Sequence, residues 1–475
     1  MTMSPTLPEL DAPWDKSGAA RRRSAYRVVI AWSFDEPGRV GESAVASGET
    51  VLGRGGPQSD DGAPRLAFHQ RRPAAVTPMP ALAAARISRV QLRMTATAEG
   101  LHVRSVGKCT MSRNGVQQEE AHFVPGDVLT LRNALVLFIT SADPPPPAPT
   151  TAGSALVAFG APDGHGIVGE SPEAWRLRDE LAFAAASPHH VLVLGASGAG
   201  KELAARALHA LSARSGRRLV ARNAATVPTA LVDAELFGTA KNYPNAGSPE
   251  RIGLLGEADG TTLFLDEIGE LPPEAQAHLL RVLDEGGEYQ RLGESVSRRS
   301  DVRVVAATNR EASSLKHDFL ARFAARVDVP GLDARREDIP VLVRHLLGRL
   351  VGKMPELAAR FFDGDSPSTR AREPRLEPAL VEALLRHQYT HHLRELERLL
   401  WLAVSTSAGE YIGRTASVDA ELRLPTEERS AEPDKSEIEA ALAAFEGSVT
   451  KAAARLALPN RFALYRLMKK YDISD

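Results

Sequence analysis

The chain has 475 residues, of which 43% are hydrophobic and 25% are charged, values typical of globular proteins and not of disordered, collagen-like or disulfide-rich ones. Its 58 basic and 60 acidic residues nearly cancel, so any affinity for nucleic acid must come from a local patch and not from the overall charge. A single cysteine excludes internal disulfides and a zinc site built from cysteines, and the absence of a long apolar run at the N-terminus excludes a signal peptide or membrane anchor, so we expect a cytoplasmic protein.

Polar stretches divide the sequence into three expected domains. The run SADPPPPAPTTAGS is rich in proline and small residues and predicts a semi-extended linker over 141–162. A second polar run, PTEERSAEPDKS, predicts a linker over 425–435. Residues 1–24 predict a flexible arm. The folded domains are therefore expected at 25–140, 163–424 and 436–475.

Short apolar runs separated by Gly, Pro and Asn turn signals predict an all-β sandwich over 25–140. Examples are YRVVIAW, LHVRSV and LVLFIT. Between these runs lie Gly53-Arg54, Ser88-Arg89 and Asn114-Gly115, whose guanidinium, hydroxyl and amide groups are suited to hold a phosphate and a peptide backbone. Taken singly, each pair is a common loop sequence, and Asn-Gly is foremost a tight-turn dipeptide.

The order of these pairs resembles the forkhead-associated domain, whose pattern is Gly-Arg, then Ser-x-x-His, then Asn-Gly, and which binds phosphothreonine peptides. The resemblance implies that Arg54 and Ser88 contact the phosphate, that Asn114 contacts the peptide backbone, and that Arg89 assists. The chain departs from the pattern at Gln91, where the family has a structural histidine, and in a long preceding loop rich in Gly, Pro and Ala. Two interpretations stay open: a domain that binds a phosphothreonine protein, or a degenerate copy that only packs against the next domain.

The sequence HHVLVLGASGAGKE is an apolar run that leads into a glycine-rich turn and then into the helical pattern LAARALHAL, the context of a phosphate-binding loop. The glycines let backbone N–H groups approach phosphates, the helix N-terminus adds partial positive charge, and Lys201 can reach the β- and γ-phosphates. The strict pattern ends in Ser or Thr, whereas this one ends in Glu202. The expected nucleotide contacts are Gly195, Ala196, Ser197, Gly198, Ala199, Gly200, Lys201 and Glu202.

Three further apolar runs end in polar residues suited to nucleotide chemistry. TTLFLDE ends in Asp266, which can bind Mg2+, and Glu267, which can polarise an attacking water. VRVVAATNR carries Asn309, whose amide can orient the γ-phosphate or the water, and RLVARN ends in Asn223. Because ligands of open parallel sheets bind at the carboxyl ends of the strands, these groups predict a site that hydrolyses ATP.

These segments resemble the AAA+ ATPases, and specifically the central domain of sigma-54 activators, over about 166–408. The matching sequences are GASGAGKE, ELFG, GLLGEADGTTLFLDEIGELP, LLRVLDEGGEYQRLG, AATNR and LRELERLL. Glutamate after the loop lysine is usual in that group. The resemblance implies an α/β subdomain over 163–335 followed by a helical lid over 336–424.

The resemblance also implies roles for individual residues. Asn223 would switch Glu267 between idle and active states. Asn309 would be the first sensor of the nucleotide and Arg394, in the lid, the second. The sequence IVGES, with Ile167 and Val168, would border the adenine.

Such ATPases form rings in which an arginine of one subunit completes the site of its neighbour. We therefore expect a hexameric or heptameric ring assembled from dimers. The family places two arginines in the segment that here reads LKHDFLARF, where Arg322 fits the second position and Lys316 occupies the first. Lysine keeps the charge but lacks the planar fork of a guanidinium.

Sigma-54 activators carry a Gly-Ala-Phe-Thr-Gly-Ala loop after ELFG, which contacts sigma-54. This chain reads TAKNYPNAGSPERIG there, with neither the Phe nor the Thr in the corresponding residues, about Asn242 to Gly247. Two hypotheses follow. Either Tyr243 replaces the phenylalanine and the protein remodels sigma-54 RNA polymerase, or the protein is a DNA-binding regulator or repressor that works without sigma-54.

The last 40 residues predict three short helices with apolar stripes at helical spacing. From Ser448 to Lys470 the chain has six basic residues and no acidic one, which is a local patch suited to DNA. The sequence AAARLALPNRFALYRLMKKY resembles the Fis-type helix-turn-helix of sigma-54 activators, and such domains pair on inverted half-sites about one helical turn apart. The expected DNA contacts are Asn460, Arg461, Tyr465, Arg466, Lys469 and Lys470.

The predicted architecture is therefore multidomain: a forkhead-associated-like all-β sandwich, an α/β AAA+ P-loop NTPase with a helical lid, and an all-α helix-turn-helix. The expected cofactors are ATP and Mg2+. The expected partners are DNA upstream of a promoter, sigma-54 RNA polymerase, a phosphothreonine protein and further copies of the chain, and no membrane.

Overall fold

The computed structural model describes residues 24–59, 62–73, 75–142, 157–284, 286–310, 315–352, 354–362 and 373–424, and beyond them Lys435, Ile438, Leu442, Met468 and Tyr471. The chain forms two compact units, Met1–Leu422 and Arg423–Asp475. Most of the predicted arm and of the two predicted linkers lies outside the described residues. None of the described helices is long and apolar enough to cross a membrane.

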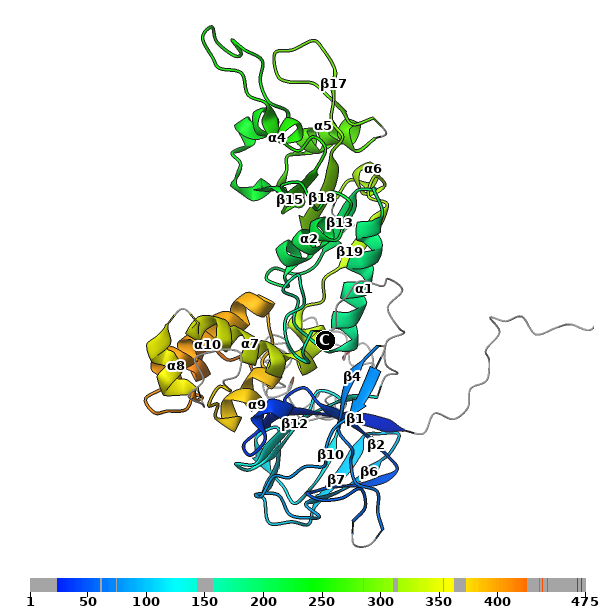
Figure 1. Ribbon diagram of the computed structural model, residues 1–475, viewed down its shortest axis with the longest axis vertical. Coiled ribbons are helices and arrows are strands. Elements are labelled where there is room, and N and C mark those ends of the chain that lie inside the picture. Colours follow the sequence, from blue (N-terminus) through cyan, green and yellow to red (C-terminus); the bar gives the residue numbers. More distant parts are fainter. Residues whose placement is uncertain are drawn as a thin grey trace, which may run out of the picture. The chain divides into compact units, whose positions relative to one another are not determined.

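The N-terminal part of the first unit consists of two antiparallel sheets (Figure 1). One has the strand order β5-β4-β2-β1-β12-β11-β8-β9 and the other the order β10-β7-β6-β3. The strands are β1 (Ala25–Ser33), β2 (Ser43–Ser47), β3 (Glu49–Leu52), β4 (His69–Arg72), β5 (Ala75–Pro78), β6 (Leu92–Ala96), β7 (Leu101–Ser105), β8 (Met111–Arg113), β9 (Val116–Gln117), β10 (Glu120–Phe123), β11 (Val128–Leu131) and β12 (Leu135–Ser141). The prediction of an all-β N-terminal region is confirmed.

Strand β1 is buried on both faces, which explains why its sequence is a continuous apolar run and does not alternate. Val28 and Ile30 pack in the sandwich core, together with Phe123 of the other sheet. Val29 and Trp32 pack instead in a cluster with helices from the C-terminal part of the unit. One strand thus belongs to two hydrophobic cores.

The middle of the unit is a parallel sheet of order β14-β15-β18-β13-β19, flanked by helices (Figure 1). Its strands are β13 (Val191–Leu194), β14 (Val220–Asn223), β15 (Thr262–Asp266), β18 (Arg303–Thr308) and β19 (Ala325–Asp328). The helices are α1 (Pro172–Ala186), α2 (Lys201–Ala210), α3 (Val232–Phe237), α4 (Gly253–Glu257), α5 (Pro273–Leu283) and α6 (His317–Leu320). Successive side chains of β15 enter different hydrophobic cores. Leu263 and Leu265 pack in one core and Phe264 packs in the other, as expected for a sheet that is covered on both faces.

The register of this sheet brings the ends of the predicted strands together. Asn223 at the end of β14 lies opposite Asp266 at the end of β15. Leu194, the last residue of β13, lies opposite Thr308 at the end of β18. The polar residues that follow these strands therefore meet at one edge of the sheet.

Two loops extend side by side beyond α4 and α5 (Figure 1). The first runs between α3 and α4, and the second carries the hairpin β16 (Glu288–Tyr289) and β17 (Arg298–Arg299). Isolated bridges pair Thr239 with Arg251 across the base of the first loop and with Leu292 of the second. The two loops are thus joined through their backbones.

Five helices form the predicted lid: α7 (Ile339–Val351), α8 (Pro355–Phe361), α9 (Pro378–Arg386), α10 (His392–Thr406) and α11 (Ala416–Glu421). The 3-10 segment η6 (Leu332–Asp338) joins them to the parallel sheet, and the predicted subdomain boundary after residue 335 falls within it. Helix α10 buries Leu396, Leu399, Leu400 and Ala403, and this stripe at helical spacing faces the lid core.

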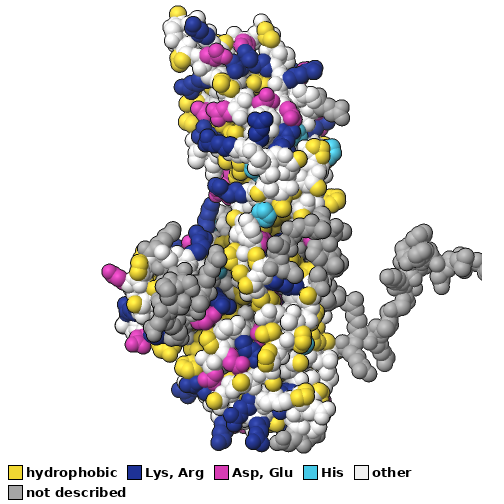
Figure 2. Space-filling model, in the orientation of Figure 1, with side chains coloured by type: hydrophobic (Ala, Val, Ile, Leu, Met, Phe, Trp, Pro, Cys, Tyr) yellow, Lys and Arg dark blue, Asp and Glu magenta, His cyan; other side chains and the backbone are white. Residues whose placement is uncertain are grey.

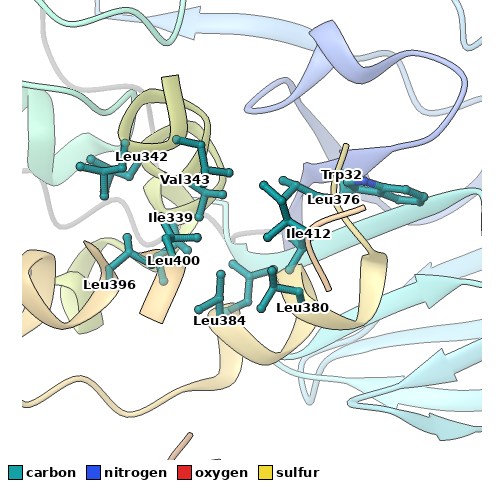
Figure 3. Packing of buried hydrophobic residues seen from close by; sticks show 14 of the residues in the cluster. Trp32, Ile339, Leu342, Val343, Leu376, Leu380, Leu384, Leu396, Leu400 and Ile412 are labelled. Atoms are coloured by element: carbon teal, nitrogen blue, oxygen red, sulfur yellow. The ribbon is translucent and has the colours of Figure 1, made fainter. Parts of the chain in front are cut away.

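The sandwich and the lid share a hydrophobic cluster (Figure 3). Trp32 of the sandwich and Leu376, Leu380 and Leu384 of the lid belong to it, and the last two lie on α9. Buried polar contacts accompany the cluster: Thr130 Oγ1 donates a hydrogen bond to Glu382 Oε2 over 2.6 Å. The sandwich is therefore packed on the lid and is not a separate body.

Acidic and basic side chains interleave over the face of the molecule shown in Figure 2. Ion pairs of the described residues include Arg222 with Glu235 at 3.2 Å and Arg298 with Glu294 at 2.8 Å. This distribution agrees with the near-zero net charge of the chain.

Few residues of the second unit are described. Lys435, Ile438, Leu442 and Met468 are helical, and Ile438 and Met468 are buried. The predicted DNA contacts Asn460, Arg461, Tyr465, Arg466, Lys469 and Lys470 lie outside the described residues.

Candidate functional site

The glycine-rich turn lies between β13 and α2, as its sequence predicts. Gly195, Gly198 and Gly200 all have positive φ, at 154°, 78° and 110°, conformations that glycine adopts without a steric penalty. A Cβ atom at Gly198 would also overlap the carbonyl oxygen of His391 in the lid. The turn therefore depends on glycine both for its shape and for the close approach of the lid.

Lys201 opens α2 and is buried, with 6% of its surface exposed. Its Nζ donates hydrogen bonds to the carbonyl oxygens of Gly195, at 2.9 Å, and Ala196, at 3.3 Å. Burial lowers the pKa of the Lys201 ammonium, and the carboxylates of Glu267 and Asp266 oppose that shift. The positive charge of this lysine thus lies inside the turn, at the amino end of the helix, where a phosphate is favoured.

The two carboxylates follow β15. Asp266 Oδ1 accepts the backbone N–H of Glu267 over 3.0 Å. Glu267 has the left-handed backbone conformation, with φ at 51°, which is rare for a residue with a side chain and is often found at functional sites. The strand therefore ends at Asp266, and the chain changes direction at Glu267.

A cavity of 370 Å³ lies between the parallel sheet and the lid. It is lined by eleven of the predicted nucleotide-site residues, namely Ile167, Val168, Ser197, Gly198, Ala199, Gly200, Lys201, Glu202, Asp266, Glu267 and Arg394. Its apolar wall includes Leu177, Leu203, Leu342 and Leu346. A cavity that combines apolar side chains with cationic and carboxylate groups fits a nucleotide, whose base is flat and whose phosphates are charged.

Sequence reasoning missed the contribution of α7. Leu342, His345, Leu346 and Arg349 all line the cavity, and their spacing places them on one face of the helix. Burial lowers the pKa of His345, and the Arg349 guanidinium lowers it further. The signal in the sequence was this mixed stripe, because a histidine and an arginine interrupt an otherwise apolar helix face.

Two predicted residues of the sheet edge do not line the cavity. Asn223 Oδ1 accepts the N–H of Ala225 over 2.9 Å, so its side chain caps a local turn. No hydrogen bond between Asn223 and Glu267 is present among the described residues. Asn309 is exposed after β18, whereas its neighbour Thr308 is fully buried, with its hydroxyl accepting the N–H of Arg310 at 3.1 Å.

Arg322 lies just after α6 and also does not line the cavity of its own chain. Its Nε forms an ion pair with Asp284 at 2.8 Å, and the arginine side chain is 45% exposed. Lys316, at the start of α6, donates from Nζ to the carbonyl oxygen of Pro273 at 3.2 Å. The guanidinium of Arg322 is thus held at the surface in a weak, solvent-accessible pair.

The loop between α3 and α4 places Tyr243 against the second loop. A Cβ atom at Gly293 would overlap the Tyr243 ring, so the ring packs on that glycine. Tyr243 remains 39% exposed, and the neighbouring positions 241–247 are exposed as well. An exposed aromatic side chain is therefore packed where the first loop meets the second.

In the sandwich, three of the four predicted phosphopeptide residues come together. The N–H of Arg54 donates to the carbonyl oxygen of Ser88 over 3.2 Å, and a Cβ atom at Gly53 would overlap the carbonyl oxygen of Arg89. Ser88 Oγ accepts the N–H of Lys108 over 3.1 Å. Arg54, Arg89 and Lys108 are exposed, so three cationic residues lie on the loops whose backbones meet at Ser88. Lys108 is the member of this group that sequence reasoning missed.

Gln91 braces the loop beside this group. Its Oε1 accepts the N–H of Cys109 at 3.3 Å, and its Nε2 donates to the carbonyl oxygen of Cys109 at 2.9 Å. Gln91 is fully buried. Gln91 thus stands where the resembling family has a histidine, and its side-chain amide makes these two hydrogen bonds with the backbone of Cys109.

Asn114 does not join the group around Ser88. Its side chain accepts the N–H of Val128 at 2.9 Å and donates to Asp127 at 2.6 Å, which fixes the turn after β8. The backbone carbonyl oxygen of Asn114 accepts a hydrogen bond from the guanidinium of Arg386 in α9. This asparagine therefore holds a tight turn that faces the lid.

Several known proteins are similar to parts of this chain. Residues 167–329 match the family described as the sigma-54 interaction domain. The chain is 36% identical over 318 residues to the transcriptional regulatory protein ZraR of Salmonella typhimurium, covering 64% of this chain and 68% of that protein. It is 38% identical over 258 residues to the Nif-specific regulatory protein of Bradyrhizobium diazoefficiens, covering 53% and 41%. A solved structure of NtrX from Brucella abortus in complex with ATP is 30% identical, covers 64% and 69%, and has a TM-score of 0.45.

The separation of charges in the cavity gives a first prediction. Lys201→Ala should abolish ATP binding, because it removes the buried cation at the turn. Glu267→Gln should leave binding intact but lower turnover by about 10²–10⁴-fold, the usual contribution of a group that handles a proton. Equilibrium binding of a fluorescent ATP analogue and steady-state phosphate release measure the two effects. The exposed Glu257→Gln is the matched control, and equal loss of binding in both site variants would contradict the division of roles.

Proposed function

The chain belongs to the sigma-54-dependent transcriptional activators, a family of AAA+ ATPases, and from that premise we propose that it couples ATP hydrolysis to transcription under the control of its N-terminal sandwich. The observation that carries the proposal is the single cavity in which the turn lysine, the two strand-end carboxylates and a lid arginine meet. Lys201, Asp266, Glu267 and Arg394 all line it. They come from three separate segments, so their convergence reflects the fold and not one local motif.

Mg2+ fits this site as a partner of the nucleotide. No cluster of three or more His, Cys, Asp or Glu side chains suited to hold a metal occurs in the described part of the chain. Mg2+ is commonly bound by one or two carboxylates together with substrate phosphates, and Asp266 supplies such a carboxylate. When bound, the ion would neutralise charge on the phosphates.

The other predicted residues of the sheet edge, the lid and segment 167–168 each have a proposed task. Glu267 would polarise the attacking water, since its left-handed turn points it away from the path of the strand. Asn223 would hold Glu267 idle after leaving its local turn, and Asn309 would report the γ-phosphate. Arg394 would bring the lid onto the phosphates, and Ile167 and Val168 would contact the base.

We propose that Arg322 acts on the neighbouring subunit of a hexameric or heptameric ring. It is half exposed and lies outside the cavity of its own chain, whereas an arginine supplied in trans stabilises charge on a transferring phosphoryl group. Its surface pair with Asp284 costs little to break. Lys316 takes the place of a second arginine and would contribute charge without bidentate geometry.

For the mechanical contact we propose that Tyr243 replaces the missing phenylalanine. The exposed ring, packed on Gly293 of the second loop, can move with both loops, and an aromatic anchor is suited to a protein interface. The second candidate is regulation without sigma-54, which the absence of both the Phe and the Thr favours.

For the signal we propose that the sandwich binds a phosphothreonine protein through Arg54, Ser88, Arg89 and Lys108. Exposed cationic residues on loops that meet at a serine are suited to a phosphate. Asn114, whose side chain holds the turn after β8, would contact the peptide backbone. The C-terminal unit would read DNA through Arg461 and its neighbours, as a paired helix-turn-helix.

The loop proposal predicts that Tyr243→Ala loses promoter opening but keeps ATPase activity, whereas Tyr243→Phe keeps both, because only the ring is required. In vitro transcription with purified sigma-54 RNA polymerase on a mapped promoter measures this. Tyr411→Ala is the control, since Tyr411 is equally exposed, at 40% against 39%, but lies in the lid.

If the wild-type chain opens no sigma-54 promoter while it hydrolyses ATP and binds DNA, the second candidate holds. Genome-wide mapping of its binding sites would then identify promoters of another class. Full promoter opening by Tyr243→Ala would show that the loop works without the ring.

The phosphate proposal predicts that Arg54→Ala and Lys108→Ala each weaken binding of a phosphothreonine peptide by about tenfold or more, since a hydrogen bond to a charged group contributes about 1.5–3 kcal/mol. Fluorescence polarisation with members of a phosphothreonine peptide library measures the affinity, with the unphosphorylated peptides for comparison. Arg104→Ala, an exposed arginine of β7, is the control. If the wild-type sandwich binds no member of the library, it serves only to pack on the lid.

A further inference from the structure

Segment 167–171 begins with two residues that line the cavity, Ile167 and Val168, and one buried carboxylate holds its last two residues. Asp338, at the end of η6, is 1% exposed. Its Oδ1 accepts the N–H groups of Glu170, at 2.7 Å, and Ser171, at 2.9 Å, and its Oδ2 accepts the hydroxyl of Ser171 at 2.5 Å. A carboxylate with three donors fixes the backbone in place. Asp338 therefore fixes the end of this segment, while Arg178 of α1 binds the carbonyl oxygens of Ile167 and Gly169, both at 2.9 Å.

The residue next to Asp338 binds the sandwich. Glu337 accepts a hydrogen bond from Arg27 Nη2 of β1 at 2.8 Å, and the same nitrogen lies 2.6 Å from its other carboxylate oxygen. Both side chains are nearly buried, at 10% and 9% exposed. A buried ion pair is costly to break from one side, because the remaining charge stays unpaired.

A second arginine of the sandwich binds the same segment directly. Arg72 of β4 pairs with Glu170 through Nη2 at 2.6 Å and Nε at 3.1 Å, a bidentate contact. The ring nitrogen of Trp175 also donates to Glu170, at 3.2 Å. Sandwich arginines thus hold the segment at two points, through Glu337 beside Asp338 and through Glu170.

We propose that Arg27 and Arg72 of the N-terminal sandwich are positioning residues for the nucleotide, which hold segment 167–171 in its binding conformation. This inference rests on the proposed function, in which Ile167 and Val168 contact the base. It goes further in naming the route by which the sandwich sets nucleotide affinity. A signal that loosens the sandwich would act on ATP binding before it acts on turnover.

The charges around Glu337 support this route. Burial raises the pKa of Glu337 to about 7, Arg27 opposes that shift, and Asp338 and Glu173 of α1 add to it. Arg71 of β4 also faces Glu337. Without Arg27, the buried Glu337 carboxylate would lose its ion-pair partner and would keep Asp338 and Glu173 as acidic neighbours, with Arg71 as the remaining cation. It would then take up a proton or turn outward, and the adjacent Asp338 would move with it.

The experiment measures binding of a fluorescent ATP analogue and ATP turnover by the full chain. Arg27→Ala should raise Kd by about fivefold or more, the lower range of coupling between sites, while turnover at saturating ATP changes less than about twofold. Arg27→Lys should restore part of the affinity. Arg27→Ala combined with Glu337→Gln should be no worse than Arg27→Ala alone, because the arginine acts through the glutamate. Arg104→Ala is the control.

Three results would overturn the inference. The first is equal affinity in Arg27→Ala and wild type. The second is a fall in turnover without a change in Kd, which would be a structural effect. The third applies if Arg27→Ala does not fold. Glu337→Gln then removes the other partner of the ion pair and should also raise Kd, so an unchanged affinity in Glu337→Gln would overturn the inference. A wild-type chain that binds no nucleotide would instead overturn the proposed function itself.

Discussion

A backbone contact between the lid and the phosphate-binding turn is the constraint on which the site depends. The N–H of Leu393 donates to the carbonyl oxygen of Gly198 over 3.1 Å, and only a glycine leaves room there for the carbonyl of His391. The lid helix α10 begins at this contact, so Arg394 enters the cavity directly after it. The nucleotide site is therefore shared between sheet and lid, and any force that moves the lid acts on the site.

The sandwich is connected to that shared site because it packs on the lid. Strand β1 places alternate side chains in the sandwich core and in the lid cluster. Buried ion pairs cross the boundary beside this apolar contact, Arg27 with Glu337 and Arg72 with Glu170. Desolvated charges tolerate little displacement. A contact of this kind connects the sandwich to the lid through buried groups.

The sequence predicted the parts of the fold that local patterns encode. Lys201, Asp266 and Glu267 were placed correctly in one cavity, because each ends or follows an apolar run and parallel strands bring such ends to one edge. The stripe of His345 and Arg349 was missed, since a helix face becomes a cavity wall only through tertiary packing. The side chain of Asn114 fixes a tight turn, as the Asn-Gly dipeptide predicts. Which side of the sandwich meets the lid is a long-range property that no local pattern carries.

The most direct test of this account is cryo-electron microscopy of the assembled full-length chain with Mg2+ and a non-hydrolysable ATP analogue. The account predicts the base against Ile167 and Val168, the γ-phosphate at Lys201, and Arg322 of the neighbouring subunit released from Asp284 and turned toward that phosphate. It would be contradicted by a nucleotide bound outside the cavity between sheet and lid, or by Arg322 still paired with Asp284 in a ring filled with nucleotide.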